Sequence, residues 1–267
     1  MKISMWSSFL YGRTFESIIP AMSNAGFDSM DLSTEHLAEL TGTADGKKRA
    51  LQWKQMALDH NIPLLQTHLL LDADLSLKGI AGQKQLDILK RELEMTMLME
   101  IPAAVIHAGT RDQDEENAAG ILLQLCDFLR GSSTALALEN LLEYDTRAED
   151  LKKRIRLAGN HPKLGICLDT GHLHVTGGAP VEFLREAGPL LIALHIADNP
   201  GDKDHHMLPL GRGTVPWRPF MLELKSMDYN GIFNFEASGE NSSLYPEILD
   251  HKLRYAAEVA RVLLAME

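Results

Sequence analysis

Short apolar runs alternate with amphipathic helical stretches along the chain, eight of each, at roughly 30 to 40 residues per unit. Most of the runs are apolar almost throughout and do not alternate with polar residues, which is typical of parallel strands covered on both faces. The predicted strands are residues 2–6, 29–34, 63–69, 103–109, 135–141, 164–171, 191–199 and 232–238.

The stretches between these runs carry the signals of helices. Thr146 and Glu149 match a capping box, and the helix that they open is predicted to end near Asn160. Other predicted helices are GKKRALQWKQMALDHN, GQKQLDILKRELEMTMLME, PWRPFMLELKSMDYNG and the C-terminal PEILDHKLRYAAEVARVLLAME.

Strict alternation of strand and helix predicts one α/β domain over residues 1–267, a (β/α)8 TIM barrel. A doubly wound open sheet is the competing architecture, but it usually has a glycine-rich first turn, and none follows KISMW. No linker rich in Pro, Gly or Ser divides the chain. The longest non-helical connection, residues 198–215, lies between the seventh and eighth predicted strands.

Charge and composition exclude some classes of function. The net charge is −11, from 37 acidic and 26 basic residues, which works against a protein whose main task is to hold a nucleic-acid backbone. No stretch approaches the roughly 18 apolar residues of a membrane span. Cys126 and Cys167 lie in apolar runs and are predicted to be buried thiols. With no signal peptide at the N-terminus, the expected location is the cytoplasm.

Metal-capable side chains end the last six predicted strands. They are His68, His107, Glu139, Asp169 with His172, His195 and Glu236. Taken singly, a residue of this kind is more often a hydrogen-bonded turn residue or a carboxylate leaving the core than a ligand. In a barrel, however, all of these strand ends meet at one mouth, where barrel enzymes keep their chemistry. Several buried carboxylates need a partner, and a divalent cation is a common one.

The connection between the seventh and eighth strands adds further candidates. Asp204 and His206 form an Asp-x-His pair, and Arg212 stands between Gly211 and Gly213. A glycine turn before a helix explains the glycines, but it does not explain the acid and the imidazole. Four other histidines lie away from strand ends and are predicted to be on the surface, namely His36, His60, His161 and His251.

Six motifs together resemble the xylose-isomerase-like barrel superfamily, which holds sugar and sugar-phosphate isomerases and epimerases together with endonuclease IV. The motifs are HAG at 107–109, LEN at 138–140, LDTGH at 168–172, LHIAD at 194–198, DHHMLPLGRG at 204–213 and FE at 235–236. The resemblance covers nearly the whole chain and implies the barrel fold and a role in carbohydrate metabolism.

The ketose 3-epimerase branch implies one divalent metal with four ligands, which match Glu139, Asp169, His195 and Glu236. The two glutamates of this branch also transfer protons, and a histidine matching His172 holds the substrate. A donor set of three carboxylates and one imidazole favours Mn²⁺, Mg²⁺ or Co²⁺ over Zn²⁺. The expected reaction is isomerisation or epimerisation of a sugar or sugar phosphate through an enediolate. Further substrate contacts are expected from His68, His107, His206 and Arg212.

The endonuclease IV branch implies a different activity, a zinc phosphodiesterase acting on abasic DNA. Its nine ligands to three zinc ions have counterparts here, which adds Asp204 and His206 as candidates for additional metal. Two features argue against this activity. The net charge is acidic, and two more residues separate His206 from Gly211 than in the endonuclease IV branch. A keto-sugar lyase or dehydratase and a non-catalytic accessory barrel are also open. Isomerase-like relatives usually carry Glu where this chain has Arg212, and a cation at this position would suit an acidic or phosphorylated substrate. The sequence does not indicate whether the chain forms homo-oligomers.

Overall fold

The computed structural model describes residues 1–108, 114–238 and 246–267, and its strands form one eight-stranded parallel sheet. Neighbouring strands follow the order β7-β6-β5-β4-β3-β2-β1-β8. The strands are β1 Lys2–Trp6, β2 Ser29–Leu32, β3 Leu64–His68, β4 Ala103–Ile106, β5 Ala135–Glu139, β6 Leu164–Asp169, β7 Leu191–His195 and β8 Ile232–Phe235. All eight predicted strands are confirmed.

Backbone hydrogen bonds just beyond β7 join the two ends of this sheet. The N–H of Ile196 donates to Asn234 O at 2.8 Å, and the N–H of Glu236 donates to Ile196 O at 3.2 Å. The sheet thereby closes into a TIM barrel, as predicted. Seven of the predicted runs continue past the end of the observed strand, because the chain leaves the ladder there and enters a loop or a helix. Residue 109, the last of the run 103–109, lies outside the described residues.

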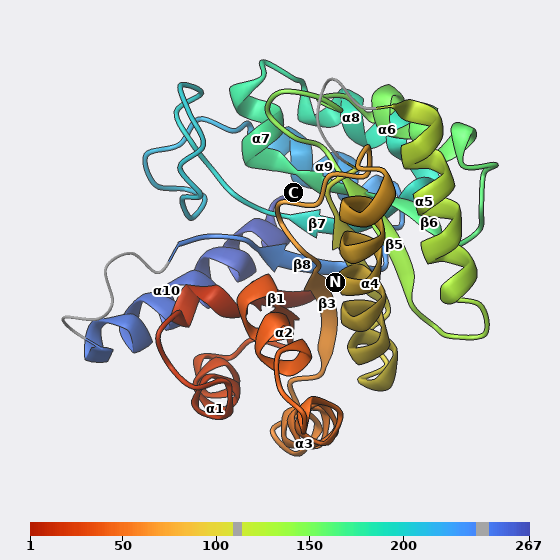
Figure 1. The fold of residues 1–267 in the computed structure, drawn as a ribbon. Coiled ribbons are helices and arrows are strands. Elements are labelled where there is room, and N and C mark those ends of the chain that lie inside the picture. Colours follow the sequence, from red (N-terminus) through yellow and green to blue (C-terminus); the bar gives the residue numbers. More distant parts are fainter. Residues whose placement is uncertain (109–113, 239–245) are drawn as a thin grey trace.

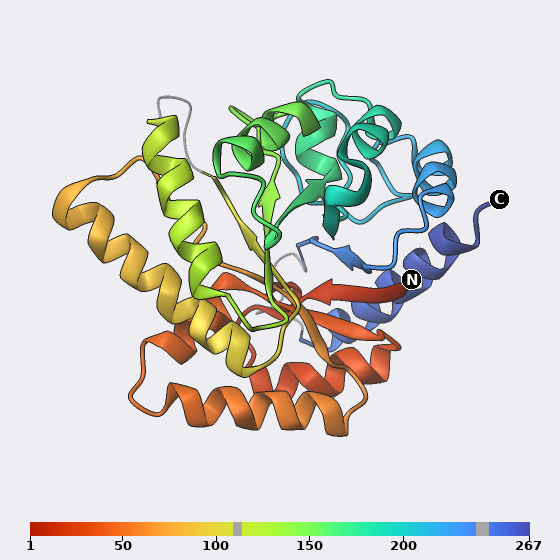
Figure 2. The same cartoon turned by 90° about the vertical axis from the view of Figure 1, so that its right-hand side faces the viewer.

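Helices surround the strands in both views of the fold (Figures 1 and 2). They are α1 Phe15–Ala25, α2 Thr34–Thr41, α3 Gly46–Asp59, α4 Gly79–Leu98, α5 Glu115–Phe128, α6 Ala148–Leu157, α7 Thr170–Val175, α8 Pro180–Ala187, α9 Trp217–Ser226 and α10 Pro246–Ala265, with short 3-10 turns at Ser7–Leu10 and Gly188–Leu190. The capping box of α6 lies one residue later than predicted, since Asp150 Oδ2 accepts from the N–H of Arg147 at 3.0 Å.

The hydrophobic core is divided by the barrel wall. Outward-facing strand residues pack with the helices in one large cluster, whereas Ala103, Val105, Ala137, Cys167 and Ala193 form a separate small cluster inside the barrel. Both cysteines are free and buried, as predicted. Within the described ranges, no helix has the length and apolar character needed to cross a membrane.

The histidine expected on the surface in α2 is instead part of the core. His36 is 2% exposed, and its Nδ1 lies 2.9 Å from both Ser7 Oγ and Ser33 Oγ. Burial lowers the pKa of His36 below its ordinary value, against the opposing charges of nearby glutamates. The prediction was wrong because Ser7 and Ser33, which directly follow β1 and β2, provide hydrogen-bond partners for a buried, neutral imidazole on the neighbouring helix. His60 and His251 are exposed as predicted, and His161 is half-buried.

A buried glutamate outside the barrel mouth gives a pH-dependent stability. Glu92 in α4 is 2% exposed, and its Oε2 accepts from the N–H of Leu70 at 3.0 Å. Burial raises the pKa of Glu92 to about 7, although the Leu70 hydrogen bond opposes the shift. The folded chain therefore binds this proton more tightly than the unfolded chain does, so stability falls as pH rises from the ordinary carboxyl pKa to about 7.

We expect Glu92→Gln to remove this loss, because the amide cannot ionise and still accepts from Leu70. The free energy of unfolding of the variant minus that of the parent should rise by on the order of 2 kcal/mol between pH 4 and pH 8. Urea denaturation at a series of pH values measures the difference. A difference that stays flat over this range would contradict the assignment.

Candidate metal centre and active site

A cavity of about 600 Å³ opens at the carboxyl ends of the strands. The predicted residues that line it are His68, His107, Glu139, His172, Asp204, His206 and Glu236. Asp169 and His195 have no exposed surface and complete the cluster from below. The sequence did not indicate the other lining residues, which are Trp6, Leu71, Asp72, Ala73, Asp74, Tyr144 and Ser238. They lie at the end of β1 or in loops after β3, β5 and β8, without the spacing of metal ligands.

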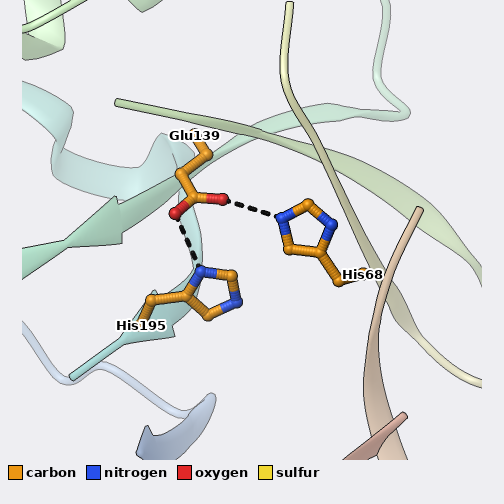
Figure 3. Close-up of side chains that lie close together, drawn as sticks. All are labelled: His68, Glu139 and His195. Atoms are coloured by element: carbon orange, nitrogen blue, oxygen red, sulfur yellow. Dashed lines mark hydrogen bonds and ion pairs between the residues drawn. The ribbon is translucent and has the colours of Figure 1, made fainter. Parts of the chain in front are cut away.

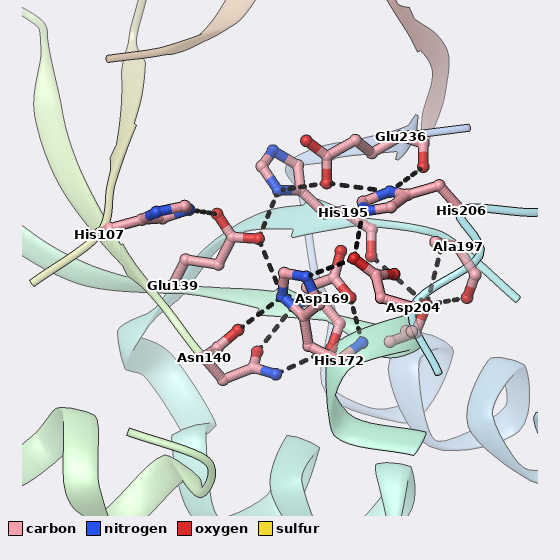
Figure 4. Close-up of polar contacts among 12 residues, drawn as sticks. His107, Glu139, Asn140, Asp169, His172, His195, Ala197, Asp204, His206 and Glu236 are labelled. Atoms are coloured by element: carbon pink, nitrogen blue, oxygen red, sulfur yellow. Dashed lines mark hydrogen bonds and ion pairs between the residues drawn. The ribbon is translucent and has the colours of Figure 1, made fainter. Parts of the chain in front are cut away.

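Glu139, the last residue of β5, is the centre of the cluster (Figures 3 and 4). Its Oε2 lies 3.1 Å from His68 Nε2 and 3.4 Å from His107 Nε2, and its Oε1 lies 2.9 Å from His195 Nδ1. Burial alone would raise the pKa of Glu139, but the charge of His195 and the hydrogen bonds of the three histidines hold it well below its ordinary value. The carboxylate is therefore the ionised partner of these rings.

Asp169 ends β6 and also caps the helix that follows. Its Oδ1 accepts from the N–H of His172 at 2.6 Å, and this fixes the first turn of α7. The side chain of Asn140 clamps the same residue, since its Nδ2 donates to Asp169 O at 2.9 Å and its Oδ1 accepts from the N–H of Asp169 at 2.8 Å. Asp169 Oδ2 has no hydrogen-bond partner among the described residues. The LDTGH segment is thus a capped helix start that also contributes Asp169 and His172 to the cluster.

Four buried side chains form the group predicted to hold a metal. Glu139, Asp169, His195 and Glu236 each place one ligand atom within 4.8 Å of the others. Glu236 Oε2 lies 3.1 Å from His195 Nδ1, as an ion pair without the alignment of a hydrogen bond.

The four side chains of this group include three carboxylic acids and only one imidazole. Burial, aided by the charges of Glu236 and Glu139, raises the pKa of Asp169 to about 7. Burial would also raise the pKa of Glu236, but the charge of His195 lowers it to about 2. Three carboxylates converge on one imidazole, and one oxygen of Asp169 has no partner. A divalent cation fits this donor set, because it would satisfy the surplus of buried negative charge.

A second group lies beside the first and lines the same cavity (Figure 4). Asp204 Oδ2 lies 3.3 Å from His172 Nε2 and 2.8 Å from His206 Nε2. Burial would lower the pKa of His206, but the hydrogen bond of Asp204 and the charge of Glu236 raise it to about 10. The three side chains of this group have the spacing of metal ligands. Asp204 Oδ2 forms ion pairs with both rings, whereas Asp204 Oδ1 is buried and has no hydrogen-bond partner among the described residues.

The long loop that carries Asp204 and His206 is held in place by its own contacts. His206 has a φ of +44°, an uncommon backbone conformation, and its Nδ1 donates to Glu236 O at 3.0 Å. Asp198 anchors the other end of the loop by accepting from the N–H of Val215 at 3.1 Å and from Trp217 Nε1 at 2.8 Å. A Cβ on Gly213 would lie 1.9 Å from Asp198 Oδ1, which explains the second glycine of the motif.

Arg212 is not brought into the main cavity. It is exposed and lines a neighbouring cavity of about 420 Å³, which also involves Lys252 and Tyr255 of α10. The two cavities share His206 and Ser238. A substrate would reach Arg212 only by extending from one cavity into the other. Spacing along the loop could not show this, because it does not tell on which side of the loop the side chain lies.

The chain is similar to known proteins over most of its length. A family model described as xylose isomerase-like TIM barrel matches residues 19–265. An uncharacterised protein of Sinorhizobium fredii is 26% identical over 167 residues, and fructoselysine 3-epimerase of Escherichia coli O157:H7 is 26% identical over 164 residues; each match covers 58% of this chain. The chain spans just over half of these relatives, 53% and 59%.

Among solved structures, D-psicose 3-epimerase from Clostridium cellulolyticum H10, crystallised with D-tagatose, superposes with a TM-score of 0.82 at 17% identity. The superposition covers 99% of each chain. At this identity the likeness shows that the two proteins share a fold.

Proposed function

The chain belongs to the xylose isomerase-like TIM barrel family, and from this premise we propose that it is a metal-dependent isomerase or epimerase of a sugar or sugar phosphate. The observation that carries the proposal is the buried group of Glu139, Asp169, His195 and Glu236, whose ligand atoms lie within 4.8 Å of one another beneath an open cavity. The fructoselysine 3-epimerase relative supports the reaction class.

These four residues would hold one divalent cation, and their mostly oxygen donors favour Mn²⁺, Mg²⁺ or Co²⁺ over Zn²⁺. Such a cation supplies Lewis acidity, which makes a C–H bond beside the carbonyl of a keto sugar easier to ionise. Epimerisation also needs one group that removes the proton and another that returns it from the opposite side. Glu139 and Glu236 suit these roles, because they flank His195 from strands on different sides of the mouth.

The histidines around the cavity suit substrate binding. Nδ1–H of His172 donates to Asn140 O at 3.0 Å, which turns Nε2 toward the second group and the cavity. His107 is fixed in the same way by Leu71 O at 2.8 Å. Together with His68 and His206, these rings offer donors and acceptors at fixed positions, which a polyhydroxylated substrate requires.

Solvent hydrogen exchange tests the proposed reaction. We expect the protein loaded with Mn²⁺ to incorporate deuterium from D₂O into a carbon next to the carbonyl of a ketose or ketose phosphate, and to form the epimer or the aldose. NMR of the sugar pool measures both. Loss of water from the substrate would indicate a lyase or dehydratase. Absence of exchange, turnover and metal binding would indicate an accessory barrel.

The second group keeps a second candidate function open. His172, Asp204 and His206 meet the spacing of a further metal site, as a zinc phosphodiesterase acting on abasic DNA would require. The net charge of −11 opposes it. Elemental analysis of the purified protein separates the candidates, since we expect about one Mn or Mg per chain for the isomerase, whereas three Zn together with chelator-sensitive nicking of an abasic duplex would establish the nuclease.

Arg212 is proposed to bind an anionic part of the substrate that extends out of the main cavity. We expect Arg212→Ala to raise KM for such a substrate roughly three- to tenfold, the worth of one charge-assisted contact that is open to solvent, with little change in kcat. Lys203→Ala is the matched control, since Lys203 is exposed on the same loop and lines neither cavity. Equal KM values for parent and Arg212→Ala would remove Arg212 from the site.

A further inference from the structure

A layer of polar side chains lies inside the barrel beneath the proposed metal centre. Its centre is Asp31 of β2, which has no exposed surface. Asp31 Oδ2 accepts from Gln66 Nε2 at 2.9 Å and from Asn234 Nδ2 at 2.7 Å. Gln66 Nε2 is also 3.4 Å from Leu194 O, so the layer is tied to β7. Two amide donors on one oxygen are an arrangement that suits a carboxylate.

The layer faces the back of His195. On one side of this ring, Nδ1 lies among the carboxylates of Glu139 and Glu236. On the other side, Nε2 is 3.6 Å from Asp31 Oδ2. Nε2 is buried and has no hydrogen-bond partner in the part of the chain that the structure describes. The distance between His195 Nε2 and Asp31 Oδ2 is less than an ångström longer than an ordinary N–H···O hydrogen bond of about 2.9 Å.

A histidine that binds a metal through one ring nitrogen carries its proton on the other, and a partner for that N–H orients the ring and makes the ligand more basic. His195 meets the four-residue group through Nδ1, so the proton of a metal-binding ring stands on Nε2. We propose that Asp31 is a positioning residue that accepts from Nε2–H of His195 and thereby sets the metal affinity of the site. This inference rests on the proposed function, since it presumes the metal centre.

The location of Asp31 supports this role over a purely structural one. A fully buried carboxylate is costly, and the small apolar residues that fill the neighbouring part of the barrel show that the interior could be packed without it. Gln66 on β3 and Asn234 on β8 fix the Asp31 carboxylate, whose Oδ2 lies 3.6 Å from His195 Nε2. The layer therefore couples β2, β3 and β8 to a ligand on β7.

The test compares metal affinity with the stability of the metal-free protein. We expect Asp31→Asn, which keeps the shape and a neutral acceptor, to weaken Mn²⁺ binding about tenfold, and Asp31→Ala to weaken it toward a hundredfold. Titration calorimetry of Mn²⁺ into metal-free protein measures the affinity. The melting temperature of metal-free Asp31→Asn should equal or exceed that of the parent, because a buried charge is removed.

Ser4→Ala is the matched control. Ser4 is buried on β1 and pairs in register with Asn234, and its hydroxyl has no hydrogen-bond partner among the described residues. This variant should bind Mn²⁺ like the parent. Should Asp31→Ala fail to fold, Asp31→Asn alone decides. Parent-like affinity in Asp31→Asn would overturn the inference and leave the metal centre standing, whereas a parent protein that binds no Mn²⁺ would overturn both.

Discussion

Replacing Asp169 by Asn is expected to abolish measurable metal binding without unfolding the protein. The amide oxygen can still accept from the N–H of His172 and keep the cap of α7, which Asp169 Oδ1 now provides at 2.6 Å. The unpaired Oδ2 becomes an NH₂ group, which points a donor at the cation and removes a negative charge. Loss of a metal ligand should weaken Mn²⁺ binding by more than the roughly 10- to 100-fold that follows loss of a residue hydrogen-bonded to a ligand.

Calorimetric titration with Mn²⁺, together with elemental analysis of protein purified without chelator, measures the effect. Asp204→Asn is the informative comparison, because it alters the second group and leaves the four-residue group intact. If Asp169→Asn binds Mn²⁺ as tightly as the parent while Asp204→Asn does not, the metal site lies in the second group and our assignment is wrong.

The fold could be predicted because its main signal is repeated. No single apolar run identifies a barrel, but eight runs separated by helical stretches leave few arrangements that bury both faces of every strand. Boundaries were less certain: β7 ends at His195, whereas the apolar run continues through Ile196 and Ala197. These later residues are buried because they lie where the barrel closes, below the mouth. A run of apolar residues in the sequence does not show whether such residues belong to a strand or follow it.

The residues of the candidate site were predictable for a related reason. The carboxyl ends of parallel strands meet in space, so side chains that end successive strands are neighbours although they are far apart in sequence. Glu139 and His195 illustrate this, at 56 residues apart and 2.9 Å between their nearest atoms. Arg212 was harder to place, because a loop residue has no such constraint and its side chain lies outside the main cavity.

Residues that support the site were missed. Asn140 holds Asp169 through two hydrogen bonds, and Asp31 lies behind His195. Neither residue is a His, Asp or Glu at the end of a predicted strand, which was the signal that identified the candidate metal ligands. Asn140 follows Glu139 directly and could have been suspected on that ground. Asp31 stands within a short run on β2, where the sequence does not show which face of the strand looks into the barrel.

Glu236→Gln is expected to fold normally and keep part of the metal affinity, yet to lose on the order of a hundredfold or more in kcat. Glu236 follows β8, is 4% exposed, and its N–H is held by Ile196 O, so the backbone places the side chain whatever its charge. Gln retains the shape and one ligand oxygen. It cannot accept a substrate proton at neutral pH, and therefore the rate of solvent deuterium exchange into the substrate should fall together with kcat.

Two further glutamates make this prediction specific. Glu92→Gln is the same chemical change at a buried position outside the cluster, so it should leave kcat unchanged and controls for the loss of a buried carboxyl group. Glu139→Gln should impair both exchange and metal binding, because Glu139 also holds three histidines in place. Should Glu236→Gln exchange and turn over at the parental rate, Glu236 would be a ligand alone. The second proton-transfer group would then have to be His172, whose Nδ1 lies 3.7 Å from Glu139 Oε1.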